Sequence, residues 1–146
     1  MKVFSLEDLQ VKALNLLSFR PRSVSEMKFR LKRLGGETGL IDRLIEILAA
    51  DGLLNDEEFA RWWVDQRIRF RPKGNIALKS ELMQKGVDKE IIVGVLLSPE
   101  QEKMLAKDLV NQRGWQDRET ITKRLLSRGF SFESVAGIID EMAQKE

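Results

Sequence analysis

A short pattern that recurs three times constrains the fold of this chain more than any other feature. In each copy a leucine stands four residues before a glycine: Leu31–Gly35, Leu82–Gly86 and Leu125–Gly129. Glycine often ends a helix because it adopts the left-handed conformation without steric cost. The three glycines follow one another at intervals of 51 and 43 residues, which is close to the length of three helices with their connections. The spacing predicts a helical repeat.

Residues at matching offsets support the repeat. Upstream of each glycine, an alanine occupies a comparable place in the first helix of each unit, at Ala13, Ala60 and Ala106. Downstream of two of the glycines, the same order follows of an apolar residue, a polar helix-start residue and a later apolar residue. These sets are Val87, Asp88 and Ile92, and Phe130, Ser131 and Val135. We therefore expect three tandem three-helix units that stack into an elongated, curved array.

Helix-start signals agree with this division. Ser23 with Glu26, and Ser98 with Gln101, fit the capping box, and Asn55 begins a further helix. No run of alternating β-branched or aromatic residues indicates a strand. The sequence predicts an all-α fold of about nine helices, over 5–18, 23–34, 38–50, 55–70, 75–85, 88–97, 99–112, 117–128 and 131–144. The three units are expected to span residues 1–54, 55–97 and 98–146.

Composition argues against catalysis. The 146 residues include no Cys, no His and no Tyr, which excludes disulfides, thiolate nucleophiles, imidazole bases and Cys/His zinc sites. The glycine-rich stretch Gly35–Gly39 lacks the Lys-Ser/Thr of a phosphate-binding loop. The acidic trio Asp56–Glu58 is interpreted as a helix N-terminus that favours negative charge, and no metal site is expected. We expect no enzyme activity, no cofactor, no membrane segment or leader, a cytoplasmic location and a monomer.

Charge is segregated along the chain although Lys and Arg (25) nearly balance Asp and Glu (23). Basic residues dominate 20–33 and 61–73, and acidic residues dominate 42–58 and 133–146. Lys123, Arg124 and Arg128 form a third basic cluster. Such clusters steer anionic partners, but basic residues near helix C-termini also complement the helix dipole. For a single residue both interpretations stay open, and for the clusters together we favour binding.

The helix expected over 55–70 can be divided into faces by its period. Phe59, Ala60, Trp63, Val64 and Phe70 fall on one face, which predicts a core position for Trp63. Trp62 falls on the margin and is expected to be partly exposed. Arg67 points toward the apolar face and is expected to pair with a neighbouring acid. We expect Trp115 to fill a gap between helices rather than to serve as a stacking platform.

Three segments together resemble the RecX family of regulatory proteins. The central segment runs from Leu54-Asn55-Asp56-Glu57-Glu58-Phe59-Ala60-Arg61 through Arg67 and Lys73-Gly74 to Glu81-Leu82-Met83-Gln84-Lys85-Gly86-Val87. Upstream, Ala13–Ser18, Arg22-Ser23 and Glu26-Met27 are similar to the family's first repeat. Downstream, Lys123–Ser131 is similar to its third repeat. Ala77 departs from the family, which often carries a basic residue at this position.

The resemblance implies a bacterial, mostly inhibitory modulator of the RecA recombinase in recombination and DNA repair. Such proteins consist of tandem three-helix units that lie along the groove of the RecA–DNA filament and suppress its ATP hydrolysis and strand exchange. On this basis the partner-binding candidates are basic residues in the matching segments that we expect to be exposed: Arg30, Arg33, Arg69, Arg71, Lys73, Lys79, Lys123 and Arg128. Their expected contacts are acidic filament surface or DNA phosphates. The alternative is a direct, sequence-independent DNA-binding protein built from helix-turn-helix-like units.

Overall fold

The structure is a computed structural model that describes residues 3–145. Over that range the chain forms nine α-helices and no strand. The helices are α1 (Leu6–Phe19), α2 (Val24–Arg33), α3 (Thr38–Ala50), α4 (Asp56–Phe70), α5 (Asn75–Gln84), α6 (Lys89–Val95), α7 (Pro99–Arg113), α8 (Arg118–Ser127) and α9 (Phe132–Lys145). The all-α prediction is confirmed.

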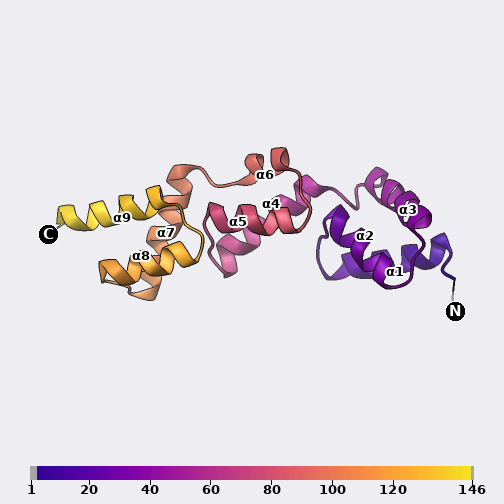
Figure 1. Ribbon diagram of the computed structural model, residues 1–146, viewed down its shortest axis with the longest axis horizontal. Coiled ribbons are helices and arrows are strands. Elements are labelled where there is room, and N and C mark those ends of the chain that lie inside the picture. The colour runs from indigo at the N-terminus through magenta and orange to yellow at the C-terminus, as the bar shows by residue number, and fades with distance from the viewer. Residues whose placement is uncertain (1–2, 146) are drawn as a thin grey trace.

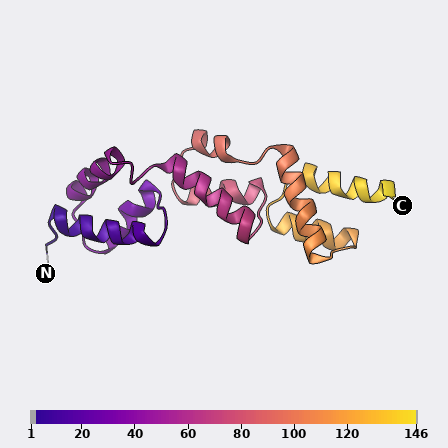
Figure 2. The same cartoon turned by 180° about the vertical axis from the view of Figure 1, so that it is seen from behind.

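The helices form three successive groups along one elongated molecule, with the two ends of the chain at opposite ends (Figures 1 and 2). Each group encloses its own apolar core. Leu9, Leu31 and Leu44 belong to the core of α1–α3, Phe59 belongs to that of α4–α6, and Phe130 to that of α7–α9. The tandem arrangement of three-helix units is therefore confirmed. Since Leu54 packs in the first core and Leu97 packs against the second, we propose to keep the unit divisions after residues 54 and 97.

The residues that defined the repeat occupy equivalent places in the structure. The three leucines of the pattern and the three alanines upstream are all completely buried: Leu31, Leu82, Leu125, Ala13, Ala60 and Ala106. The three glycines of the pattern have positive φ values: 102° at Gly35, 76° at Gly86 and 81° at Gly129. Each unit therefore ends its second helix in the same way. We call α2, α5 and α8 the second helices of their units.

Several helix starts form as the sequence predicts. Ser23 and Ser98 each make a complete capping box, and the Asn55 side chain accepts hydrogen bonds from the backbone of Glu57 and Glu58. A further capping box, which we did not predict from the sequence, joins Ser5 and Asp8 at the start of α1.

The predicted faces of α4 need two corrections. The helical period predicts that Phe70 lies on the apolar face, but it is 72% exposed because the last turn of α4 extends past the core of its unit. The same period predicts a core position for Trp63, but this residue is only half-buried, like Trp62. Both indoles pack against the edge of that core. The indole N–H of Trp63 donates to Glu81 Oε1 at 3.1 Å, and this polar contact explains its position at the edge.

Candidate interaction surface

The first and second units meet where the beginning of α2 faces the end of α5. The Ser23 hydroxyl donates to the backbone carbonyl of Lys85 at 2.7 Å. The carboxylate of Asp56, at the start of α4, accepts a hydrogen bond from the backbone N–H of Val24 at 2.8 Å. A Cβ atom at Gly86 would overlap the side chain of Ser25, so the close approach at this joint requires glycine. We call this contact the first joint.

The second and third units meet through the same kind of contact, which we call the second joint. Here the beginning of α5 faces the end of α8: the Gly74 N–H donates to the Arg128 carbonyl, and the Ile76 N–H donates to the Gly129 carbonyl, both at 3.0 Å. Glu102 of α7 accepts from the backbone N–H of Asn75 at 2.7 Å, as Asp56 does at the first joint. The two joints are thus structurally equivalent.

These contacts place the three second helices end to end in the order α8, α5, α2. A helix leaves its first N–H groups and its last carbonyl groups without partners inside the helix. At each joint, carbonyl groups at the end of one helix accept from donors at the start of the next, and opposite ends of two helix dipoles meet. Gly74 is also closed in by the backbone of Phe130. The joints therefore fix the units in one extended arrangement (Figure 1).

The second joint contains a buried carboxylate. Glu102 is 2% exposed, and its Oε1 accepts from the hydroxyl groups of Ser131 and Ser134 at 2.6 Å each. Burial alone would raise the pKa of Glu102, but these hydrogen bonds and the one from the Asn75 backbone outweigh it and hold the pKa below its ordinary value. The carboxylate therefore stays ionised and joins α7 to both α5 and the start of α9.

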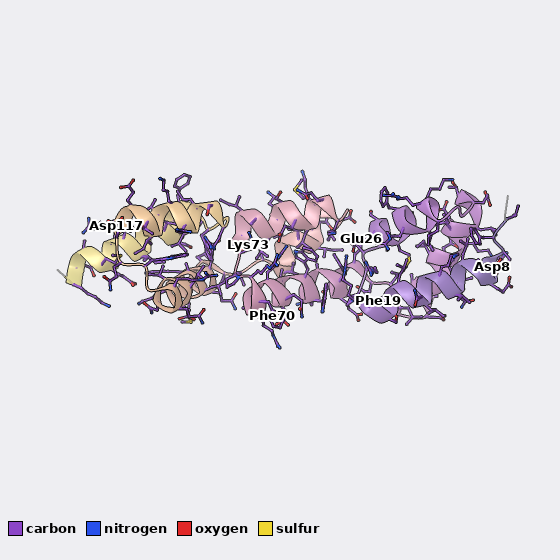
Figure 3. All side chains as sticks on the ribbon, turned by 90° about the horizontal axis from the view of Figure 1, so that it is seen from below. Asp8, Phe19, Glu26, Phe70, Lys73 and Asp117 are labelled. Carbon is purple, nitrogen blue, oxygen red and sulfur yellow. The ribbon has the colours of Figure 1, made fainter. Side chains whose placement is uncertain are left out.

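Beside the first joint lies a basic pocket of about 570 Å³. We call it the joint pocket; its lining residues are Arg20, Arg22, Ser25, Glu26, Phe29, Arg30, Gln84 and Lys85. Figure 3 shows Glu26 at the boundary between the first and second units. Burial opposes the charge on Glu26, yet hydrogen bonds from Arg20, the Ser23 backbone and Lys85 lower its pKa. The pocket therefore places four basic side chains around one engaged carboxylate.

A second basic group surrounds Trp115 in the third unit. The guanidinium carbons of Arg124 and Arg128 lie 5.8 and 5.1 Å from the centre of the indole ring. Burial, together with the nearby charges of Arg113 and Arg124, lowers the pKa of Arg128. Trp115 packs against the core of α7–α9, as predicted, and two arginines cover its outer side.

The eight predicted binding residues divide into two classes of exposure. Six are exposed: Arg30 and Arg33 on α2, Arg69 and Arg71 at the end of α4, Lys79 on α5 and Lys123 on α8. Lys73 and Arg128 are half-buried, which corrects the expectation that all eight are exposed. They lie on the two chain segments that meet at the second joint, where the Gly74 N–H donates to the Arg128 carbonyl.

Two arginines of α4 differ in their surroundings. The exposed Arg69 pairs with Asp65 one turn earlier, at 3.1 Å. Arg67 pairs with Glu81 of α5 at 2.7 Å and lies 5.0 Å from the centre of the Trp63 ring. The prediction that Arg67 pairs with a neighbouring acid is confirmed. Arg67 therefore serves the packing of the second unit, and Arg69 keeps its charge at the surface.

The structure brings some predicted residues together and separates others. Arg30 lies in the joint pocket with residues that the predicted set omitted: Arg20, Arg22, Phe29 and Lys85. Arg69 and Arg71 lie at the far end of α4, away from Arg30 on α2. The sequence did contain a signal for Arg22. It stands at the same distance before Gly35 as Lys73, a predicted binding residue, stands before Gly86.

The acidic trio at the start of α4 has contacts of its own. Asp56 serves the first joint, Glu57 pairs with Arg61 at 2.8 Å, and Glu58 donates its backbone N–H to Asn55. These contacts agree with a helix N-terminus. None of the helices between residues 3 and 145 combines the length and the apolar character needed to cross a membrane.

Comparison with known proteins gives consistent matches. Residues 11–48 match the family model for the first three-helix domain of RecX, and residues 55–96 match the model for its second three-helix domain. The regulatory protein RecX of Mycobacterium leprae is 31% identical over 144 residues, which is 91% of this chain and 84% of that protein. The regulatory protein RecX of Amycolatopsis mediterranei is 35% identical, over 77% of this chain and 67% of that protein.

Solved structures agree with these sequence matches. The crystal structure of RecX from Lactobacillus salivarius superposes with a TM-score of 0.77 at 28% identity, covering 95% of this chain and 97% of the other. A second crystal structure of a regulatory protein RecX gives a TM-score of 0.76 at 26% identity, over 92% of this chain and 74% of the other. The tandem three-helix arrangement is therefore shared with these proteins.

Proposed function

This chain belongs to the RecX family of regulatory proteins, and from that premise we propose that it regulates a RecA recombinase by binding along the groove of the RecA–DNA filament. The chain would modulate, mostly by inhibition, the ATPase and strand-exchange activities of that filament. It would act by covering part of the filament surface, and it would not catalyse a reaction itself.

The observation that carries this proposal is the pair of equivalent joints. Hydrogen bonds at both joints, such as Ser23 to Lys85 and Gly74 to Arg128, hold three small units as one long body. A long body with few internal degrees of freedom loses little conformational entropy when it binds an extended partner. Repeat proteins use such extended surfaces for binding. A filament is a partner of matching shape.

Basic residues along this body supply the proposed contacts. The candidates are spread over all three units: Arg30, Arg33, Arg69, Arg71, Lys73, Lys79, Lys123 and Arg128. We propose that they dock against acidic filament surface or DNA phosphates. Because Arg30, Arg69 and Lys123 are exposed and lie on different units, each contact would be weak alone and the sum would set the affinity.

The filament interaction can be tested by co-sedimentation with RecA assembled on single-stranded DNA. Reversing the charges of Arg69, Arg71 and Lys73 together should reduce the sedimented fraction while leaving the helical circular dichroism unchanged. Arg69→Glu and Arg61→Glu form a matched pair, since both arginines are exposed on α4 and each pairs with an acid one turn earlier. We expect R69E to weaken sedimentation more than R61E. If wild type and the triple variant sediment equally, these three residues do not contribute to filament binding.

The alternative of direct, sequence-independent DNA binding has one observation in its favour, which is the excess positive charge of the joint pocket. DNA phosphates can supply salt-sensitive binding without base recognition. This activity is compatible with the filament proposal, because the filament itself contains DNA.

A further inference from the structure

We propose that the joint pocket is a phosphate site for single-stranded nucleic acid, in which a backbone phosphate sits between Arg22 and Arg30 and a neighbouring base stacks on Phe29. This inference deepens the proposed function, because it names the part of a nucleoprotein filament that this surface would take. It does not depend on RecA itself.

Positive charge dominates the lining of the joint pocket. Four of the residues that line the pocket are cationic, and Glu26 is the only carboxylate in the lining. Arg20 donates to both oxygens of Glu26, and Lys85 Nζ lies 3.1 Å from one of them. Glu26 is therefore already engaged. Arg22 and Arg30 face the pocket without a second carboxylate among its lining residues, which leaves a net positive charge.

Holding these positive charges close together has an electrostatic cost. Arg22 is half-buried, and its Nε donates to the Leu16 carbonyl at 3.3 Å, which fixes the guanidinium at the pocket wall. Burial and the like charges of Arg20 and Arg30 lower the pKa of Arg22. An anion between Arg22 and Arg30 would relieve this repulsion. A fixed, partly desolvated guanidinium also binds an oxyanion more strongly than a mobile surface lysine does.

An exposed aromatic ring at the pocket favours nucleic acid over an acidic protein segment as the ligand. Phe29 is 60% exposed at the pocket, and its ring lies 5.7 Å from the guanidinium carbon of Arg33. An exposed ring beside arginines is a typical platform for a nucleic-acid base, because base stacking adds to phosphate contacts. A carboxylate side chain has no ring that could stack on Phe29. The combination of Arg22, Arg30 and Phe29 therefore favours a phosphodiester strand.

The test is binding of the full chain to a fluorescently labelled thymidine oligonucleotide of about twelve nucleotides, followed by anisotropy over a range of salt concentrations. Arg30→Ala should weaken binding about tenfold at low salt and make the salt dependence shallower by close to one phosphate contact. Phe29→Ala should weaken binding to the oligonucleotide about tenfold, with little effect on an abasic strand of equal charge. Arg43→Ala is the matched control, because Arg43 is an exposed arginine of α3 that does not line the pocket.

Arg22→Lys provides a variant that keeps the charge but loses the planar fork of the guanidinium, and it should also weaken binding. Thermal melts establish that each variant is folded. The proposal is overturned if wild type does not bind the oligonucleotide, if R43A loses as much affinity as R30A, or if R30A affects only binding to a labelled polyglutamate. The filament proposal is tested separately by RecA ATPase measurements. If wild type inhibits RecA while R30A and F29A bind DNA normally, the phosphate site alone fails.

Discussion

The hydroxyl of Ser23 donates to the backbone carbonyl of Lys85, 62 residues later in the chain, at 2.7 Å. The same hydroxyl oxygen accepts from the backbone N–H of Glu26 and so caps α2. One buried side chain therefore both starts a helix and closes the joint between two units. Loss of this one side chain would therefore affect both the start of α2 and the first joint.

Replacing Ser23 with alanine should destabilise the protein more than the loss of a cap alone. Ser5→Ala is the control, because Ser5 makes the same capping box at the exposed start of α1. We expect S5A to cost ~1 kcal/mol and S23A ~2–3 kcal/mol, since S23A also leaves a carbonyl at the joint without its partner. Urea unfolding followed by circular dichroism gives both values. Equal losses would show that the joint contact contributes nothing.

Glycine at a joint should be harder to replace than glycine at a free helix end. Gly129 and Gly52 both have positive φ, but a Cβ at Gly129 would overlap Ala77 whereas a Cβ at Gly52 meets nothing within 4 Å. Gly52→Ala should cost ~1–2 kcal/mol for the left-handed conformation alone. Gly129→Ala should cost at least ~1 kcal/mol more, because the second joint must open. Small-angle scattering should show a change of shape for G129A only; unchanged scattering and equal stability losses would contradict this account of the joint.

Stability should fall at acid pH partly through Glu102. Its pKa in the folded protein is below the ordinary value of 4.5, so its ionised form stabilises the fold above that pH, and the contribution is lost as the pH falls through the lowered pKa. Glu102→Gln should therefore be less stable than wild type at about pH 7, and the difference should shrink at about pH 3. Urea midpoints at both pH values provide the measurement. A difference that stays constant between them would exclude this role for the carboxylate.

The ion pair between Arg67 and Glu81 should matter more than the pair between Arg61 and Glu57. The first pair joins α4 to α5 and is about one-quarter exposed, and the second is a surface pair on one helix with both side chains more than half exposed. Arg67→Ala should cost ~2 kcal/mol, because Glu81 loses its charged partner at a half-buried site and keeps only the hydrogen bond from Trp63, while Arg61→Ala should cost less than ~0.5 kcal/mol. Chemical unfolding measures both. The ranking would be wrong if the two variants lost the same stability.

Local signals in the sequence predicted helix ends well, because a cap depends on residues only a few positions apart. Ser23 with Glu26 and the Leu82–Gly86 pattern are examples. The capping box of Ser5 was missed although its signal is equally local, because Asp8 replaces the usual Glu or Gln.

Contacts between units could not be predicted in the same way. The bond from Ser23 to Lys85 and the joint pocket depend on how whole units are placed, and no short spacing encodes that placement. The misplacement of Phe70 has a related cause. A helical wheel gives the direction of a side chain, but it does not show where the core ends along the helix. The predicted site therefore contained Arg30 without the residues that surround it.

Regulation of RecA by this protein is tested by measuring the single-stranded-DNA-dependent ATPase activity of RecA in its presence. If the chain binds along the filament, substoichiometric amounts of the wild-type chain should lower the rate of ATP hydrolysis. Charge reversal of Arg69, Arg71 and Lys73 should restore much of that rate. Full ATPase activity at a ratio approaching one protein per RecA would contradict the proposed function.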